Sequence, residues 1–193
     1  MLTPVERARR RATYDHLLKV PDHLVAEIID GELVTSPRPA SPHAHATTML
    51  SGDLTSSFGQ PPGSSVPGGW WILFEPELHL GDDVIVPDLA GWRRSGMPVL
   101  PNVAAFTQAP DWVCEVVSPS TGALDRGRKM QVYARARVGH LWLVDPIAQT
   151  LEVYRLEDDH WLVASTHGGG DPVRAEPFAA VALAMSRWWL QAG

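Results

Sequence analysis

The stretches "VPDLAGW" (residues 86–92) and "DWVCEVVSPST" (residues 111–121) each place a lone carboxylate inside an apolar, strand-like run. Asp88 follows a proline in the first run, and Glu115 lies between a cysteine and a valine in the second. Burying a charge is costly unless the charge is paired or binds a cation. These two acids are therefore the first candidates for a functional site.

Strand alternation predicts where the two carboxylates point. Glu115 shares one face of its strand with Val113 and Val117, and Asp88 shares a face of its strand with Val86 and Ala90. If the two strands pair in a suitable register, the carboxylates converge and repel each other unless a divalent cation lies between them. Oxygen ligands with open water positions suit Mg²⁺ or Mn²⁺. Such a metal can activate water and stabilise charge on a phosphate.

The segment "STGALDRGRKMQVYARARVG" (residues 120–139) is predicted to form the next helix. Asp125, Lys129 and Tyr133 are spaced four residues apart, so they line one face of it. If that face packs beside the strand of Glu115, Lys129 can point toward Glu115 and hold an attacking water or a phosphate oxygen. A surface pair between Lys129 and Asp125 is the structural alternative.

The order Pro87-Asp88, Glu115, Lys129 has the pattern of a PD-(D/E)XK nuclease, and the chain resembles the Uma-two family of restriction endonucleases within that superfamily. The resemblance runs from about residue 14 to residue 165. It is carried by five stretches: "AEIIDGELVTSPRPASPH" (26–43), "VPDLAGW" (86–92), "EVVSPST" (115–121), "DRGRKMQVYARARVGHLWLVDP" (125–146) and "TLEVYRL" (150–156).

The resemblance implies a function and a set of site residues. It implies divalent-metal-dependent hydrolysis of phosphodiester bonds in nucleic acid, with DNA as the expected substrate and Mg²⁺ or Mn²⁺ as the cofactor. Asp88 and Glu115 are implied as metal ligands, Lys129 as the catalytic lysine, and Glu27 as a further catalytic position beside them. His43 matches the family's histidine at the start of the following helix and is an accessory position, as are the helix residues Asp125 and Tyr133.

Two departures from the family pattern leave a second function open. The superfamily lysine normally stands two residues after the glutamate, where this chain has Val117. The run "RVGHLW" (residues 137–142) also carries His140 and Leu141 where relatives often have an acid and a tyrosine. The alternative is a nuclease-fold protein that binds nucleic acid or another protein without cutting. A third possibility is a structural module that dimerises through the tryptophans of "SRWWLQ" (residues 186–191).

Composition narrows the class of protein. The 193 residues carry a net charge of −6, which argues against coating nucleic acid by charge alone. The single cysteine, Cys114, permits no disulfide within the chain and suits a reducing cytoplasm. No apolar stretch approaches the roughly 20 residues of a membrane span. We expect a cytoplasmic protein, a homodimer, with no membrane partner.

The pattern along the chain predicts one α/β (α+β) domain over residues 1–193, restriction-endonuclease-like, with a single mixed sheet flanked by helices. A capping box at Thr3–Glu6 predicts an N-terminal helix, and Asp30-Gly31 predicts a β-hairpin. Further elements are expected as a helix over 42–58, strands over 70–80, 84–92, 111–118, 140–146, 150–158 and 160–166, and a closing helix over 178–191. His43 and His45 resemble a metal pair, but residues two apart on a helix do not face each other.

Overall fold

Two mixed β-sheets make up most of the protein, whose residues 11–190 are described by a computed structural model. The six-stranded sheet has the order β11-β10-β9-β8-β6-β3, with bounds His160–Gly168, Thr150–Glu157, His140–Asp145, Trp112–Val116, Leu89–Arg93 and Trp70–Phe74. The five-stranded sheet has the order β2-β1-β5-β4-β7, with bounds Glu32–Pro37, Leu24–Ile29, Asp83–Ile85, Glu77–Leu80 and Ala105–Phe106. A small third sheet pairs β12 (Pro172–Val173) with β13 (Leu183–Ala184). The expected mixed α/β class is confirmed.

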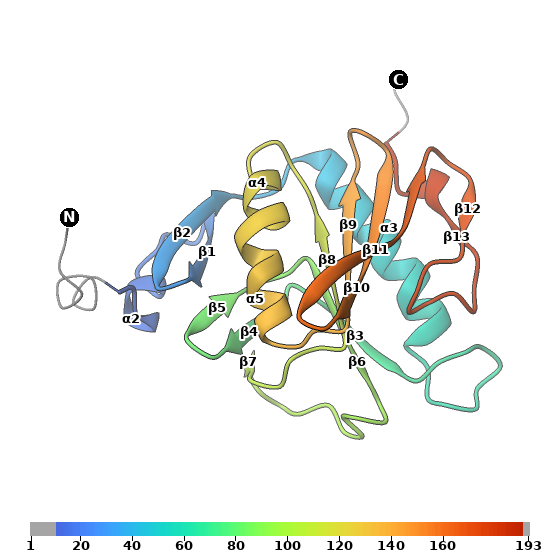
Figure 1. Cartoon of the computed structure of the whole chain (residues 1–193), viewed down its shortest axis with the longest axis horizontal. Coiled ribbons are helices and arrows are strands. Elements are labelled where there is room, and N and C mark those ends of the chain that lie inside the picture. The colour runs from blue at the N-terminus through green and yellow to red at the C-terminus, as the bar shows by residue number, and fades with distance from the viewer. Residues whose placement is uncertain (1–10, 191–193) are drawn as a thin grey trace.

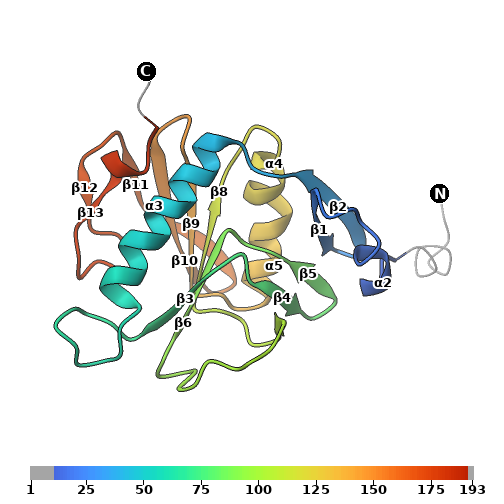
Figure 2. The same cartoon turned by 180° about the vertical axis from the view of Figure 1, so that it is seen from behind.

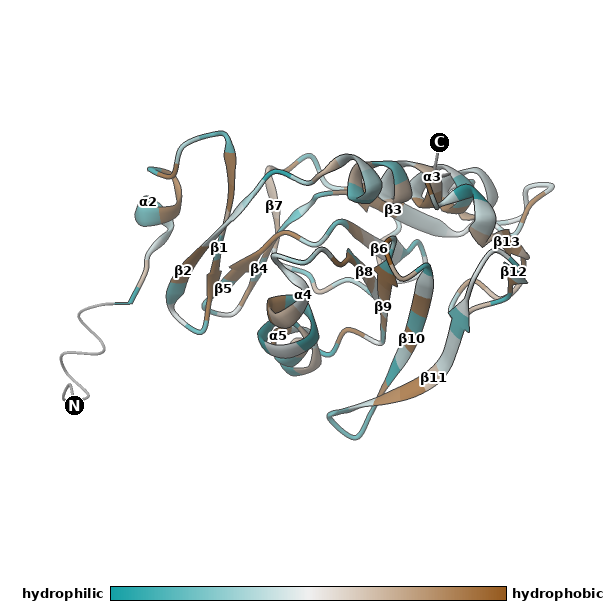
Figure 3. Cartoon of the chain, turned by 90° about the horizontal axis from the view of Figure 1, so that it is seen from above, coloured by the Kyte–Doolittle hydropathy of each residue, from teal (hydrophilic) through white to brown (hydrophobic). Residues whose placement is uncertain are grey.

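Helices cover both faces of the six-stranded sheet. The long α3 (Ser41–Phe58) lies in front of the sheet in Figure 2. In Figure 1 the opposite face is covered by a continuous helical segment made of α4 (Gly122–Leu124), a π-helical turn (Asp125–Lys129) and α5 (Met130–Arg135). The view from above separates these layers and shows apolar residues concentrated in the central strands (Figure 3).

The strand β8 contributes to a separate core on each face, as alternation predicts. Trp112 and Cys114 pack with α3 and the C-terminal segment, whereas Val113 packs with α5. Antiparallel pairing places Leu89 of β6 opposite Cys114, and β9 pairs with β8 in parallel. Glu115 therefore faces the α5 side of the sheet.

The hairpin of β1 and β2 has the turn that its sequence predicts. Asp30 and Gly31 both have positive φ values, +54° and +78°, as a two-residue type I′ turn requires. The strands pair from Leu24 opposite Pro37 to Ile29 opposite Glu32.

The prediction of one sheet is wrong, because the segment 70–92 forms four strands rather than two. The chain leaves the six-stranded sheet after β3, makes β4 and β5 in the five-stranded sheet, and returns with β6. Both crossings contain a proline, Pro76 or Pro87, which has no backbone N–H to donate to a ladder. Asp88 therefore lies in the connection between the two sheets and not inside a continuous strand.

The predicted closing helix is also wrong. The segment 178–190 instead contains β13 and a 3₁₀ turn at Met185–Arg187, because packing against α3 overrides its helix-favouring alanines. Trp188 and Trp189 are buried within their own chain, and their indole N–H groups donate to Asp53 Oδ2 and to the Gly169 carbonyl. These two tryptophans therefore do not offer the dimer contact predicted for them.

The N-terminal prediction is tested only in part. The capping box at Thr3–Glu6 lies outside the described residues, and the first described helix is α2 (Tyr14–Leu17), which begins after Thr13. None of the helices between residues 11 and 190 is long and apolar enough to span a membrane. The assignment of the whole chain to one domain stays a prediction.

Candidate active site

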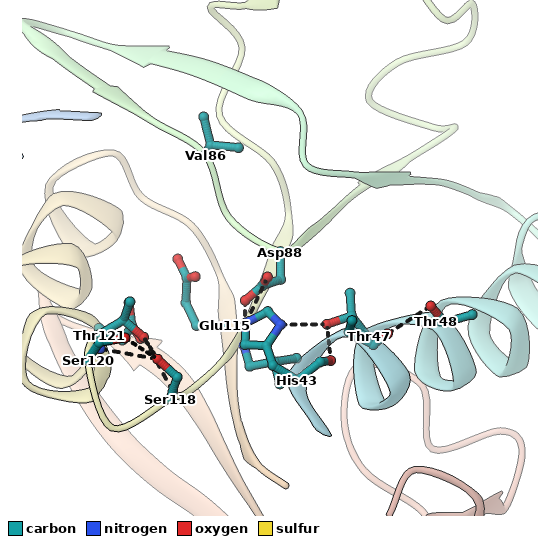
Figure 4. A network of polar contacts seen from close by, with 12 residues as sticks. His43, Thr47, Thr48, Val86, Asp88, Glu115, Ser118, Ser120 and Thr121 are labelled. Atoms are coloured by element: carbon teal, nitrogen blue, oxygen red, sulfur yellow. Dashed lines mark hydrogen bonds and ion pairs between the residues drawn. The ribbon is translucent and has the colours of Figure 1, made fainter. Parts of the chain in front are cut away.

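A cavity of about 270 Å³ opens where the chain passes between the two sheets. Five of its lining residues are carboxylates, and the four identified from the sequence come from separate segments: Glu27 of β1, Asp88 of the inter-sheet connection, Glu115 of β8 and Asp125 of the π-helical turn. Lys129 lines the same cavity. Figure 4 shows the Glu115 side chain beside Asp88 and His43, which line the same cavity.

Lys129 places its ammonium group among these carboxylates. The Nζ atom lies 2.8 Å from Glu115 Oε1 and 3.0 Å from Glu27 Oε1, with Asp125 Oδ1 at 3.9 Å. It also lies 3.5 Å from the Val86 carbonyl oxygen. Only 4% of the lysine side chain is exposed, so these contacts replace its hydration shell. The predicted position of Lys129 next to Glu115 is confirmed. The alternative, an exposed ion pair between Lys129 and Asp125, is not observed.

The helix delivers this lysine through the predicted face. Asp125, Lys129 and Tyr133 are all buried, with 3%, 3% and 0% of each residue exposed. The Tyr133 hydroxyl donates to Glu115 Oε1, the same oxygen that Lys129 contacts. The π-helical turn spans Asp125–Lys129, and such turns occur frequently at functional sites.

Burial and the neighbouring charges shift the pKa values of Lys129 and Glu115 strongly. Burial lowers the pKa of Lys129, but the nearby Glu115, Glu27 and Asp125 raise it further, so its pKa lies well above the ordinary value. Lys129 is therefore a cation at neutral pH and cannot accept a proton there. Burial raises the pKa of Glu115 well above its usual range, and the Lys129 ammonium opposes that rise.

Glu115 keeps one oxygen open to the cavity. Both of its contacts, from Lys129 and Tyr133, go to Oε1. In the described residues the one fully buried side-chain N or O atom without a hydrogen bond is Trp112 Nε1. The Oε2 atom of Glu115 has no hydrogen bond to any of residues 11–190 and is not among the fully buried atoms without a partner, so it is available to a ligand in the cavity.

Glu27 joins the five-stranded sheet to this group. Its Oε1 accepts the Val86 backbone N–H at 2.9 Å as well as the Lys129 ammonium. The residue is 3% exposed, so it is not a solvated hairpin residue. Glu27 thus fixes both the inter-sheet connection and the position of the lysine.

Asp88 and His43 also line the cavity and contact each other. Asp88 Oδ2 accepts the Val116 backbone N–H at 2.7 Å, and Oδ1 lies 3.2 Å from His43 Nε2 (Figure 4). Burial lowers the pKa of His43, but the hydrogen bond and charge of Asp88 outweigh this and raise it overall. His45 instead contacts the Arg187 carbonyl oxygen at 3.1 Å, so the two histidines do not share a site.

The carboxylate oxygens in this cavity are the type of ligand that a hard divalent cation prefers. Asp88 and Glu115 line one cavity with carboxylate oxygens, and Mg²⁺ is commonly held by one or two carboxylates while it keeps several waters. Across residues 11–190 there is no group of three or more His, Cys, Asp or Glu residues arranged to hold a metal. A cation here would therefore depend on the two carboxylates together with water or substrate oxygens.

The two departures from the family pattern lie away from the cavity lining. Val117 is 2% exposed and packs into the apolar core on the α5 side. His140 begins β9 opposite Trp112, and burial lowers its pKa. Neither position adds a polar group to the site, so Lys129 is the lysine that reaches Glu115.

The sequence reasoning missed Glu75, a carboxylate that also lines the cavity. It lies at the first crossing between the sheets with φ +43°, and its backbone N–H donates to the Asp88 carbonyl at 3.1 Å. Burial raises the pKa of Glu75 and Asp88 adds to the rise, whereas Arg38 and His43 oppose it. The signal was an acid next to a proline inside an apolar run, the same signal that identified Asp88.

Polar residues at the cavity opening were missed as well. Ser118, Ser120 and Thr121 follow β8, and their hydroxyls lie together near Glu115 in Figure 4. Ser118 Oγ is 2.9 Å from Ser120 Oγ and 3.0 Å from Thr121 Oγ1. Arg38, in the loop after β2, also lines the cavity. Nothing in the local sequence indicated that these two loops meet.

Comparisons with known proteins point to a nuclease family. The sequence profile of the Uma2 family, described as "Putative restriction endonuclease", matches residues 11–186. The crystal structure of a protein from Anabaena variabilis, described as a putative nuclease belonging to DUF820, is similar with a TM-score of 0.73 and 24% sequence identity. That match covers 92% of this chain and 97% of the other. None of the curated proteins matches the chain.

Proposed function

Because the chain belongs to the Uma2 family, we propose that it is a divalent-metal-dependent endonuclease that hydrolyses phosphodiester bonds in DNA. One observation carries this proposal. The Lys129 ammonium lies 2.8 Å from a carboxylate, Glu115, that lines the same cavity as Asp88. Asp88 and Glu115 supply carboxylate oxygens for a cation, and Lys129 supplies a fixed positive charge for a phosphate or a water. Lys129 takes this role although the superfamily's usual lysine position is occupied by Val117.

Each residue of the site has a role in this proposal. Asp88 and Glu115 would hold Mg²⁺ or Mn²⁺, which when bound supplies positive charge at the phosphate. Lys129, which remains charged, orients the attacking water or a phosphate oxygen. Glu27 holds Lys129 in place, and His43 holds Asp88.

Two accessory residues act through Glu115 and Lys129. Tyr133 fixes the Glu115 carboxylate through its hydroxyl, so that the oxygen without a hydrogen bond faces the cavity. Asp125 adds a third negative charge near the ammonium, which helps to keep Lys129 protonated. Both are positioning residues in this proposal.

The test is metal-dependent cleavage by variants that keep the shape of the site. Supercoiled plasmid and single-stranded DNA are incubated with the protein in Mg²⁺, in Mn²⁺ and in EDTA. We expect cutting by the wild-type chain in either metal and none in EDTA. Asp88→Asn and Glu115→Gln should lower the cleavage rate by at least about 100-fold, as expected when a group that stabilises transition-state charge is removed.

A matched control uses a carboxylate outside the cavity. Asp171 is exposed, so Asp171→Asn removes the same charge without touching the site and should leave the rate unchanged. Cleavage that persists in both Asp88→Asn and Glu115→Gln would contradict the proposal. Binding of DNA without cutting in any metal would favour the alternative of a nuclease-fold binding module.

The proposal includes the setting in which the protein acts. A nuclease of this kind would act in the cytoplasm, on nucleic acid and not at a membrane. The homodimer expected from the sequence is kept as a prediction, without the two C-terminal tryptophans as its interface. Sedimentation of the purified chain measures this directly.

A further inference from the structure

Arg38 differs from most arginines of this protein in having no carboxylate partner. Among the described residues, seven arginines form ion pairs: Arg11, Arg126, Arg128, Arg135, Arg137, Arg155 and Arg187. Four do not: Arg38, Arg93, Arg94 and Arg174. The charge of Arg38 opposes the rise that burial causes in the pKa of Glu75, which lines the same cavity, but no ion pair joins the two among the described residues, so the guanidinium is available to an anion from outside.

The other arginines without carboxylate partners have other contacts away from the cavity. Arg93 and Arg94 lie over the rings of Trp70 and Trp71. Arg174 donates to two backbone carbonyls near the C-terminal segment. In the part of the chain that the structure describes, Arg38 and Lys129 are the only arginine or lysine residues that line the cavity.

Lys129 cannot serve an incoming polyanion at the cavity opening. It is 4% exposed, and its ammonium is surrounded by carboxylates. Arg38 is exposed, and its one hydrogen bond, from Nη2 to the Asp22 carbonyl oxygen at 2.9 Å, leaves the rest of the guanidinium free. A guanidinium offers several N–H donors in a planar arrangement that matches a phosphate.

The loop that carries Arg38 restricts where the guanidinium can go. Pro37 and Pro39 flank it, so the φ angles on both sides are fixed and the backbone of Arg38 itself is restricted by the following proline. The Asp22 carbonyl holds the side chain from the other direction. A preorganised donor loses less conformational entropy when it binds.

We propose that Arg38 binds a phosphate of the nucleic-acid backbone at the cavity opening, and that it positions the strand over Asp88 and Glu115. This inference rests on the proposed function and names the residue that holds its substrate. The hydroxyls of Ser118 and Ser120, which line the same cavity, supply neutral donors for the same backbone. The net negative charge of the chain makes such a local cation necessary for binding a polyanion.

The test measures binding in EDTA, so that it does not depend on cutting. A fluorescein-labelled oligodeoxynucleotide of about 20 nucleotides, single-stranded or paired, is titrated by anisotropy over a range of NaCl concentrations. Arg38→Ala should weaken binding by about tenfold. It should also reduce the slope of log K against log salt by about 0.7 for the single strand or about 0.9 for the duplex, the value of one phosphate contact.

Two further variants separate a phosphate contact from a general loss of charge or of folding. Arg38→Lys keeps the charge and should restore the salt slope. Arg174→Ala removes one positive charge outside the cavity and should leave both affinity and slope at the wild-type values. Circular dichroism confirms that each variant is folded.

The outcomes distinguish this inference from the proposed function. Equal binding by the wild-type chain and Arg38→Ala overturns the inference, and metal-dependent cutting can still stand. No measurable binding by the wild-type chain overturns it as well. Binding that depends on Arg38 without metal-dependent cutting supports the inference and overturns the proposed function.

Discussion

Two clusters of opposite charges lie on adjacent sides of one helical segment and differ mainly in their exposure. In the buried site, Lys129 contacts Glu27 and Glu115 with 4% of its side chain exposed. In the surface ion-pair network, Arg135 contacts Asp30 Oδ1 at 2.8 Å and Asp83 Oδ2 at 3.0 Å with half of its side chain exposed. Both clusters pair a basic side chain with two carboxylates. We therefore expect differences in their contributions to stability and binding to come from their different exposure to water.

Exposure sets what each cluster can do. Water screens the surface network, so each of its pairs contributes little to the free energy of unfolding. The buried carboxylates cannot be solvated in this way, and each depends on the lysine for its counter-charge. Both clusters line a cavity, but the charges of the buried site are shielded from water and therefore act more strongly on a nearby group than the exposed charges do.

The largest effect on stability is expected from removing the buried cation. Lys129→Met keeps nearly the same volume but leaves buried carboxylates without a counter-charge, which should lower the free energy of unfolding by about 3–5 kcal/mol at about pH 8. Without the ammonium the folded-state pKa of Glu115 rises further, so the folded variant binds a proton that the unfolded chain does not. Its stability should therefore be higher at about pH 5 than at about pH 8.

Urea unfolding followed by tryptophan fluorescence at both pH values checks this prediction. The stability deficit of Lys129→Met relative to the wild-type chain should shrink as the pH is lowered. A deficit below about 1 kcal/mol at the higher pH would mean that the lysine does not compensate these carboxylates. It would remove the distinction between the two clusters.

An intermediate effect is expected from the hydroxyl that fixes Glu115. Tyr133→Phe removes a buried hydrogen bond to a carboxylate and should lower the free energy of unfolding by about 1.5–3 kcal/mol. The matched control is Tyr154→Phe, whose hydroxyl donates to Glu152 Oε2 at 2.5 Å in a more exposed setting. The control should lose less stability in the same urea titration, and an equal loss in both variants would contradict the argument from burial.

The smallest effect is expected in the surface ion-pair network. Arg135→Met should lower the free energy of unfolding by less than about 1 kcal/mol, because Arg135 and Asp30 are exposed and the buried Asp83 keeps its hydrogen bond from the Asp30 backbone N–H. The loss should shrink further in about 0.5 M NaCl, which screens exposed charges. A loss comparable to that of Lys129→Met, measured in parallel, would show that exposure does not separate the two clusters.

Local patterns predicted the parts of the site that lie within single elements. The four-residue spacing placed Asp125, Lys129 and Tyr133 on one face, and strand alternation placed Glu115 on the side of that helix. The Asp30-Gly31 turn was also predictable, because few residues adopt positive φ at both central positions of a hairpin. These features depend on helix and strand periodicity and on turn residues, all of which lie within one short segment of the sequence.

Features that depend on distant pairing could not be predicted in this way. An apolar strand does not indicate which of two sheets it joins, and β5 joins β1 through the pairing of Ile28 with Val84, more than fifty residues apart. The closing segment has helix-favouring composition, but its tryptophans pack into the core beneath α3 instead. The positions of Arg38 and Glu75 at the cavity follow from the same long-range arrangement.

The inter-sheet connection at Val86–Asp88 also bears on when the site forms during folding. Glu27 holds Val86 from one sheet, and Asp88 holds Val116 in the other, so the cavity needs both sheets in place. Contacts between residues this far apart in sequence form late, because the intervening loop must be closed first. A newly synthesised or partly unfolded chain therefore carries the same residues without the assembled site, so under the proposed function only the folded protein would cut DNA.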